Sequence, residues 1–340
     1  MNKVKVGIVG VGHLGSLHAK LYKEIPDAEI VGLFDVDSEK LNNVAKNLNL
    51  DVYTSLESLI DNIDAIDIVT PTSFHYHIAM KALEAGKHVF LEKPITETVE
   101  QAEKLVAKAK ENNCLIQVGH IERFNPAVLS LHDVNLAPIF IEAHRLASFN
   151  PRGTDVAVIL DLMIHDLDLI SYLVKSKPVH IDASGVGVIS DTVDIANARI
   201  EFENGCVANV TASRISAKKM RKMRIFQKNA YISMDFAEGF SEIFYIPKDD
   251  QQPFHDGTLA FSLGEIEHGS IKKEIKYNRL ERKNINPLRR ELRTFTDAIL
   301  NNVTPLVSGK DGLEALKLAT KVLQKIAEHR DKAQSLLAEE

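Results

Sequence analysis

The 340-residue chain has little of what marks secreted, membrane or nucleic-acid-binding proteins. Its two cysteines, Cys114 and Cys206, are too few and too far apart for a disulfide framework or a zinc cluster. No apolar run approaches the roughly 18 residues of a membrane-spanning helix, and no signal-peptide pattern follows the start. With a net charge of −6, nothing general attracts the chain to nucleic acid or to anionic membranes. We therefore expect a globular cytoplasmic protein with neither of these partners.

Short apolar segments alternate with helical patterns over the first third of the chain. The segments that have the composition of buried strands are 4–9, 29–34, 65–69, 88–91 and 115–119. A strand that is followed each time by a helix favours a parallel sheet with helices on both faces. The pattern predicts a Rossmann-type α/β domain over residues 1–122.

After about residue 124, β-branched stretches dominate, and only one long helical pattern, at about 156–174, interrupts them. These stretches are 139–147, 179–189, 195–202, 205–214, 222–227 and 230–235. They predict an α+β domain over residues 123–340 with a large, mostly antiparallel open sheet. Two terminal helical patterns cover about 287–301 and 310–334, and this region, 287–334, is the part that can pack back onto the first domain.

A glycine-rich turn, Gly10, Gly12 and Gly15, follows the first predicted strand and opens a helix. In a dinucleotide fold the first glycine permits the tight turn, the second lets backbone approach the pyrophosphate, and the third allows close packing. Amide groups at the helix start then face the diphosphate. The context favours a dinucleotide site over an ordinary glycine turn. The other turn residues expected at the cofactor are His13 and Leu14.

Asp35 ends the second strand, 20 residues after Gly15. A carboxylate there hydrogen-bonds the adenosine ribose hydroxyls and repels a 2′-phosphate, so NAD is favoured over NADP. Lys40 lies close enough in sequence to keep NADP open. In the alternative interpretation Asp35 only caps the next helix, although Asp37 and Ser38 are also available for that.

The end of the next strand carries further candidates for cofactor contact, because ligands of open α/β sheets bind outside the carboxyl ends of strands. These candidates are Thr70, Pro71, Thr72 and His75. In the alternative interpretation His75 is an exposed helix histidine.

Glu92, Lys93 and Pro94 follow the next strand, near the expected place of the nicotinamide. Proline restricts Lys93 to extended geometry. A lysine that is partly desolvated beside a cationic nicotinamide has a lowered pKa and can hydrogen-bond or deprotonate a substrate hydroxyl. We expect Glu92 to contact the cofactor. Taken alone, Lys93 also fits a solvated surface lysine.

Asp161 and His165 lie on one face of the long predicted helix, together with Asp168. Asp161 can orient the His165 ring and stabilise its protonated form. Histidine is a natural general base for a secondary alcohol. The alternatives are solvated or capping polar groups, or a metal site. Because this pair supplies only two ligands, we expect no metal.

Several of these motifs together resemble the Gfo/Idh/MocA oxidoreductase family. The resemblance covers nearly the whole chain and rests on the glycine turn and on the four segments 69–75, 82–89, 92–94 and 161–165. It implies hydride transfer between NAD(P) and a sugar or polyol carbon, with catalytic roles for Lys93, Asp161 and His165. It also implies a cis bond before Pro94, and a homodimer or homotetramer formed through the sheet of the second domain.

A narrower resemblance, to UDP-N-acetylglucosamine 3-dehydrogenase-like members, rests on segment 118–126 and on the region from Arg152 to Asp168. Residues 156–160 lack the glycine-rich stretch of many other members. The resemblance implies that four residues line the substrate side, where arginine suits a diphosphate. They are His120, Arg123, Asn125 and Arg152. For the basic run 218–224 we favour a solvated strand.

The sequence thus favours an NAD-dependent dehydrogenase that acts on a sugar hydroxyl, foremost at C3 of a UDP-N-acetylhexosamine. Two alternatives remain at this stage. One is a relative that acts on an inositol, a free sugar, a keto-sugar or a tetrapyrrole. The other is a non-catalytic NAD-binding regulatory protein.

Overall fold

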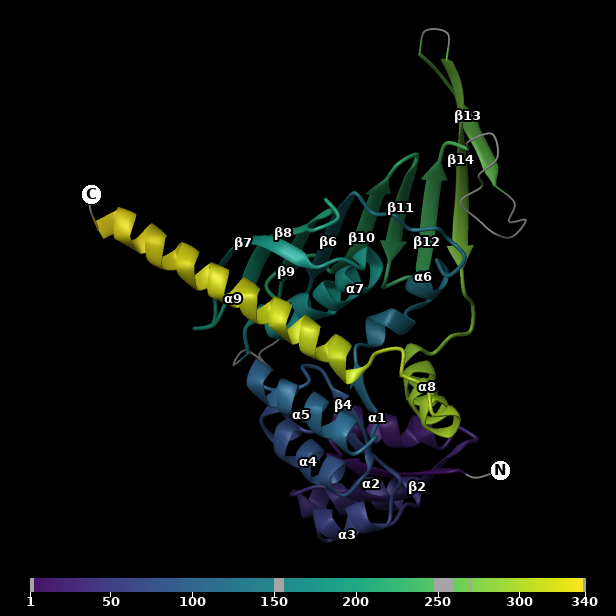
Figure 1. Cartoon of the computed structure of the whole chain (residues 1–340), viewed down its shortest axis with the longest axis vertical. Coiled ribbons are helices and arrows are strands. Elements are labelled where there is room, and N and C mark those ends of the chain that lie inside the picture. Colours follow the sequence, from purple (N-terminus) through teal and green to yellow (C-terminus); the bar gives the residue numbers. More distant parts are fainter. Residues whose placement is uncertain (1–2, 150–155, 248–259, 269–270, 339–340) are drawn as a thin grey trace. The chain divides into compact units, whose positions relative to one another are not determined.

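A computed structural model describes residues 3–149, 156–247, 260–268 and 271–338 of the chain (Figure 1). Its contacts divide the chain into two compact units. Unit 1 comprises Met1–Ile121 and Asn286–Lys317, and unit 2 comprises Glu122–Ile285 and Leu318–Glu340. Each unit is therefore built from two segments that are far apart in the sequence.

Unit 1 is organised around a five-stranded sheet with the order β2-β1-β3-β4-β5, in which every pair is parallel. Its strands are β1 (Val4–Val9), β2 (Ala28–Phe34), β3 (Ala65–Ile68), β4 (His88–Glu92) and β5 (Ile116–Gly119). Its helices are α1 (His13–Tyr22), α2 (Ser38–Leu48), α3 (Leu56–Asp61), α4 (Thr72–Glu84), α5 (Val99–Glu111) and α8 (Pro287–Asn301). The first turns of α9 (Gly309–Ala338) complete it. This is the doubly wound α/β sheet that the sequence predicts.

Helix α8 belongs to the core of this unit although it lies far away in the sequence. Leu292 and Phe295 are fully buried in the apolar cluster that includes strand β1 and helix α1. The ring of Phe295 meets Phe90 of β4 edge to face, with the centroids 5.8 Å apart. The C-terminal segment therefore fills part of the core of the N-terminal sheet.

Unit 2 is organised around a nine-stranded sheet with the order β13-β14-β12-β11-β10-β6-β9-β8-β7. Its strands are β6 (Phe140–Leu146), β7 (Pro178–Val186), β8 (Ile195–Phe202), β9 (Val207–Ser213), β10 (Met220–Gln227), β11 (Ala230–Asp235), β12 (Phe240–Tyr245), β13 (Phe261–His268) and β14 (Ile271–Glu281). The helical segments η1 (Ile121–Phe124) and α6 (Pro126–Leu129) precede β6, and η2 (Ile159–Met163), which leads into α7 (Ile164–Val174), lies between β6 and β7. All pairs are antiparallel except β6 with β9, and α7 packs against these two strands.

The two faces of this sheet differ in character because side chains alternate along each strand. On one face isoleucines of neighbouring strands are fully buried, including Ile141, Ile225 and Ile232. On the other face half-buried aromatic side chains form a row of cross-strand neighbours, with most adjacent rings stacked. The row consists of Phe140, Phe226, Tyr231, Phe244 and Tyr277.

A few local features complete the fold. Val52 forms a single bridge to Leu33, and Ser55 caps the next helix. The helix predicted over about 156–174 starts at Ile159 with a π-helical turn. Asn229, between β10 and β11, has a left-handed conformation with φ at 63°, which asparagine in a turn tolerates well. Residues 248–253, whose charged and Pro-containing sequence indicates a loop, lie outside the described residues.

Candidate active site

In the glycine turn, two glycines are closely packed by neighbouring backbone atoms and the third faces open space. Gly10 has φ at +91°, and a Cβ there would lie 2.6 Å from the Val69 carbonyl oxygen; a Cβ on Gly15 would overlap the Gly10 carbonyl. Around Gly12, in contrast, no atom lies within 4 Å of the Cβ position. Helix α1 begins here with His13, and its first turn has no acidic residue. Open space beside uncapped amides fits a dinucleotide pyrophosphate.

Asp35 does not cap a helix. Its carboxylate accepts hydrogen bonds from the amides of Val11, at 2.7 Å, and Asp37, at 2.9 Å. Asp37 instead caps α2 by accepting from the amide of Lys40, whose ammonium also pairs with Asp37 at 2.7 Å. Asp35 thus ties the glycine turn to the end of β2, where a ribose is expected, and Lys40 is already paired with a different carboxylate.

We expect Asp35→Ser to raise the affinity for NADPH relative to NADH about tenfold, because it removes the charge that repels a 2′-phosphate. Fluorescence titration with the two reduced cofactors measures the two dissociation constants. The control is Asp61→Asn, which removes one negative charge from the exposed end of α3 in the same unit; it should leave the ratio of the two constants unchanged. An unchanged ratio in Asp35→Ser would remove the basis for preferring NAD.

His75 is buried, so it is not an exposed helix histidine. Its Nδ1 lies 3.0 Å from the carbonyl oxygen of Pro94, and its Nε2 lies 3.0 Å from that of Thr70. Burial lowers the pKa of the ring, and the hydrogen bonds oppose this only in part. His75 therefore joins the ends of β3 and β4. Pro71 and Thr72, at the start of α4, complete this corner.

The Lys93–Pro94 bond is cis, as the family resemblance implies. The backbone amide of Lys93 faces the Glu92 carboxylate, 3.3 Å away. A Cβ on Gly119 of β5 would lie 2.8 Å from that carboxylate, so glycine at this position makes room for it. Glu92 is thus held at the end of β4, next to Lys93, for which the sequence predicts a catalytic role.

Behind Glu92 lies a buried ion cluster that the sequence analysis missed. His18 Nδ1 of α1 is 2.8 Å from Asp67 of β3, and His18 Nε2 is 3.4 Å from Glu92. Burial disfavours a charged ring, but the charges and hydrogen bonds of both carboxylates outweigh it and raise the pKa of His18 to about 10. A usable signal was Asp67, an acidic residue inside the otherwise apolar strand AIDI.

In unit 2, Asp161 and His165 lie on one continuous helical segment and both are half-buried. Asp161 is in the π-helical turn η2, and His165 is in the first turn of α7. The predicted helix carries both residues, and its first turn, at Asp161, is π-helical. π-Helical turns inside helices occur frequently at functional sites. The structure places Lys93 in unit 1 and this pair in unit 2.

The residues predicted to line the substrate side have diverse surroundings. Arg123 is buried, forms a bidentate pair with Asp168 at 2.8 and 2.6 Å, and stacks over Tyr172. Asn125 caps α6 and donates to Glu122 and to the Phe236 carbonyl oxygen. Their roles toward a substrate stay predictions, as does that of His120, which is buried in unit 1. Arg152 lies outside the described residues.

A second buried ion cluster supports α7. The Arg145 guanidinium binds both oxygens of Asp166, each at 2.8 Å, and one oxygen of Glu122 at 2.9 Å, and Arg221 pairs with the same Glu122 oxygen. Burial raises the pKa of Glu122, but the two arginines overcome this and lower it. Because Asp166 directly follows His165, this cluster fixes the segment that carries His165.

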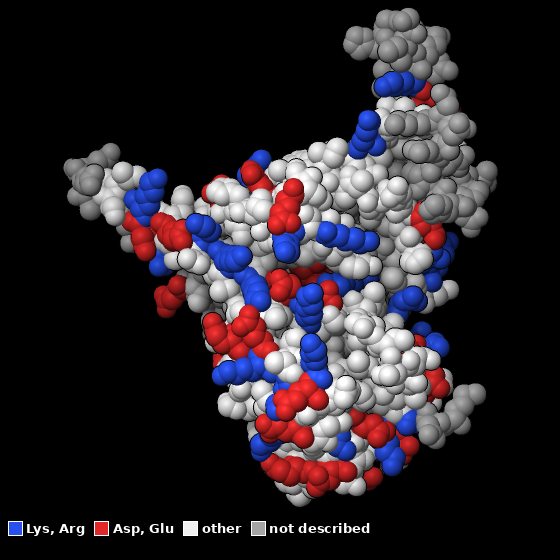
Figure 2. Space-filling model, viewed as in Figure 1, with Lys and Arg blue, Asp and Glu red and all other residues white. Residues whose placement is uncertain are grey.

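On the face shown in Figure 2, Lys and Arg are interspersed with Asp and Glu. Lys222 and Arg224 of the basic run pair with Asp235 and Glu142. Among the described residues, no group of three or more metal-ligating side chains and no helix able to cross a bilayer occurs.

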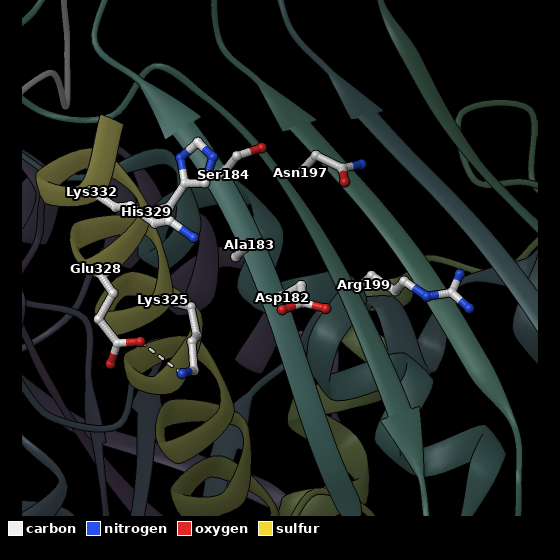
Figure 3. A pocket seen from close by; sticks show the side chains of 9 residues that line it. All are labelled: Asp182, Ala183, Ser184, Asn197, Arg199, Lys325, Glu328, His329 and Lys332. Atoms are coloured by element: carbon white, nitrogen blue, oxygen red, sulfur yellow. Dashed lines mark hydrogen bonds and ion pairs between the residues drawn. The ribbon is translucent and has the colours of Figure 1, made fainter. Parts of the chain in front are cut away.

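One pocket lies along strands β7 and β8 and the second half of α9 (Figure 3). Within it Lys325 pairs with Glu328 at 2.7 Å. The polar residues that line it are Asp182, Ser184, Asn197, Arg199, Lys325, Glu328, His329 and Lys332. None of them is among the residues to which we assign cofactor binding or catalysis.

Comparison with known proteins identifies the family. Residues 4–120 match the family model for oxidoreductases with an NAD-binding Rossmann fold, and residues 139–233 match the GFO/IDH/MocA C-terminal domain. The chain belongs to the Gfo/Idh/MocA oxidoreductase family. It is an NAD(P)-dependent oxidoreductase that acts on CH–OH groups, as its family relatives are.

Two relatives within the Gfo/Idh/MocA family are informative. UDP-N-acetylglucosamine 3-dehydrogenase of Acidithiobacillus ferrooxidans is 41% identical over 246 residues, which are 72% of this chain and 78% of that protein. The solved structure of that dehydrogenase superposes with a TM-score of 0.84 and covers 96% of this chain and 98% of its own. The scyllo-inositol 2-dehydrogenase (NAD(+)) of Bacillus subtilis is 32% identical over 63% of this chain and 68% of its own.

Proposed function

We propose that this chain is an NAD-dependent dehydrogenase that oxidises the C3 hydroxyl of a UDP-N-acetylhexosamine. The observation that carries the proposal is the likeness to UDP-N-acetylglucosamine 3-dehydrogenase, in sequence and over almost the whole fold. The preference for NAD rests on Asp35, whose carboxylate stands at the end of β2 with no arginine or lysine bound to it in the described residues. We also propose that the protein acts in the cytoplasm.

In this proposal the chain's residues divide the chemistry between them. His165 takes the proton of the substrate hydroxyl as a general base, and Asp161 orients its ring. Lys93 hydrogen-bonds the same oxygen and stabilises the negative charge that develops on it. The bound nicotinamide supplies a hydride acceptor for the C3 hydrogen. Loss of the proton and the hydride leaves a keto group at C3, so atoms and charge balance.

The test is oxidation of UDP-N-acetylglucosamine that carries deuterium at C3, with NAD and the purified full-length protein. We expect the light absorbance of the reduced cofactor to appear, and we expect that cofactor to carry the deuterium from C3. Reactions with UDP-N-acetylgalactosamine, free N-acetylglucosamine and myo-inositol define the substrate class. Turnover of inositol or free sugar alone would overturn the nucleotide-sugar assignment, and reduced cofactor without the label would overturn oxidation at C3. No turnover with any substrate, although NAD binds, would favour a regulatory protein.

We also propose that the chain forms a homodimer or homotetramer through the aromatic face of the nine-stranded sheet. The row from Phe140 to Tyr277 is half-buried, and Phe261 of β13, which pairs with Tyr277, extends it and is largely exposed. A second copy would remove this apolar surface from water. A mass of 37.8 kDa by light scattering, that of one chain, would contradict the proposal.

A further inference from the structure

The His18–Asp67–Glu92 cluster has a geometry that packing alone does not require. His18 and Asp67 are completely buried, and the Glu92 side chain keeps 14% of its surface exposed. The imidazole stands between the two carboxylates, at 2.8 and 3.4 Å, and the ring of Phe90 meets it edge to face. One end of the cluster is therefore closed in the core, and the other end reaches the surface beside Lys93.

The cluster has one positive and two negative groups. The carboxylates hold the imidazole protonated well above neutral pH. Burial raises the pKa of Asp67, and the charge and hydrogen bond of His18 oppose that rise. With His18 protonated and both carboxylates ionised, one negative charge is left over. Asp67 is the closer partner of His18, so we assign the remaining negative charge to Glu92.

We propose that His18 is a positioning residue that holds the Glu92 carboxylate in place at the end of β4, so that the site binds the oxidised nicotinamide more tightly than the reduced one. The inference rests on the proposed function for the use of NAD at this edge of the sheet.

The physical reason is the difference in charge between the two forms of the cofactor. The oxidised nicotinamide ring is a cation and the reduced ring is neutral, so a fixed carboxylate nearby stabilises only the oxidised form. Ligands of open parallel sheets bind at the carboxyl ends of the strands, which is where Glu92 stands. Without the imidazolium, the group that holds Glu92 in place is lost, and Asp67 and Glu92 are neighbouring like charges that repel each other.

The experiment measures the dissociation constants of NAD⁺ and NADH for the full-length protein near neutral pH. For Glu92→Gln we expect the ratio of the NAD⁺ constant to the NADH constant to rise about tenfold, because that variant lacks the charge itself. For His18→Gln we expect a rise in the same direction, because the carboxylate is no longer held at the end of β4.

Two further titratable groups interact with the carboxylates of the cluster, Tyr22 of α1 with Asp67 and His75 of α4 with Glu92, and both variants keep them. The matched control is Phe90→Leu, which removes the aromatic contact of His18 and keeps every charge. It should lower the melting temperature and leave the ratio unchanged. This separates positioning of a charge from loss of packing.

The ratio decides the outcome. An unchanged ratio in Glu92→Gln overturns the inference, also when both dissociation constants weaken by the same factor. This outcome can be read even if His18→Gln fails to fold. A folded His18→Gln variant with the wild-type ratio also overturns the inference. A wild-type protein that binds neither form of the cofactor overturns the proposed function, and the inference with it.

Discussion

Replacing Lys93 with alanine is expected to lower kcat about 1000-fold while the protein still binds NADH with nearly its normal affinity. The ammonium hydrogen-bonds the oxygen on which charge develops, and loss of such a group typically costs 10²- to 10⁴-fold in rate. Binding persists because the pyrophosphate and the ribose are held elsewhere, at the Gly12 turn and at Asp35. Steady-state kinetics and fluorescence titration measure the two quantities separately.

The control for this variant is Lys81→Ala. Lys81 is an exposed lysine of the same unit, and its ammonium pairs with Glu57 on the surface. We expect its kcat to equal that of the wild type. If Lys93→Ala turned over substrate at the wild-type rate, Lys93 would be the solvated surface lysine that its sequence context also allows.

Replacing Arg145 with alanine is expected to lower the free energy of unfolding by about 3–5 kcal/mol, because it leaves two buried carboxylates without their main counter-charge. Asp166 and Glu122 both bind this guanidinium, and all three side chains are almost fully buried. Urea denaturation of the full-length protein measures the loss. Because Asp166 follows His165, we also expect a lower kcat under conditions in which the variant remains folded.

The matched variant is Arg224→Ala, which breaks one half-exposed ion pair, with Glu142. Exposed pairs contribute at most about 1 kcal/mol. If both arginine variants had similarly small effects on the unfolding free energy, the Arg145 cluster would not be a main support of α7.

Features with local signals could be predicted from the sequence. The glycine turn and Asp35 could be predicted because the glycines and the carboxylate at the strand end lie within about 30 residues of each other in the sequence. The five parallel strands followed from apolar segments that alternate with helical patterns. Asparagine is likewise a residue that turn chemistry favours at the left-handed position 229.

What could not be predicted depends on contacts between distant segments. β6 pairs with β9 and β10, which are not its neighbours in the sequence, and no local pattern specifies that order. Arg145 occupies an inward position of β6, after Ile141 and Ala143, but its partners come from two other elements. His18 is similar, since only the fold brings it to Asp67. The π-helical turn at Asp161 has no signature among the residues that form it.

The divided make-up of unit 1 has a consequence for how the chain folds as it leaves the ribosome. Residues 286–317 belong to the same compact unit as residues 1–121, and they bring Leu292 and Phe295 into its core. At 5–20 residues per second, the 196 residues between positions 121 and 317 take roughly 10–40 s to synthesise. During this interval Phe90 lacks one of the aromatic rings that cover it. Unit 1 can therefore be completed only after residues 286–317 have been synthesised.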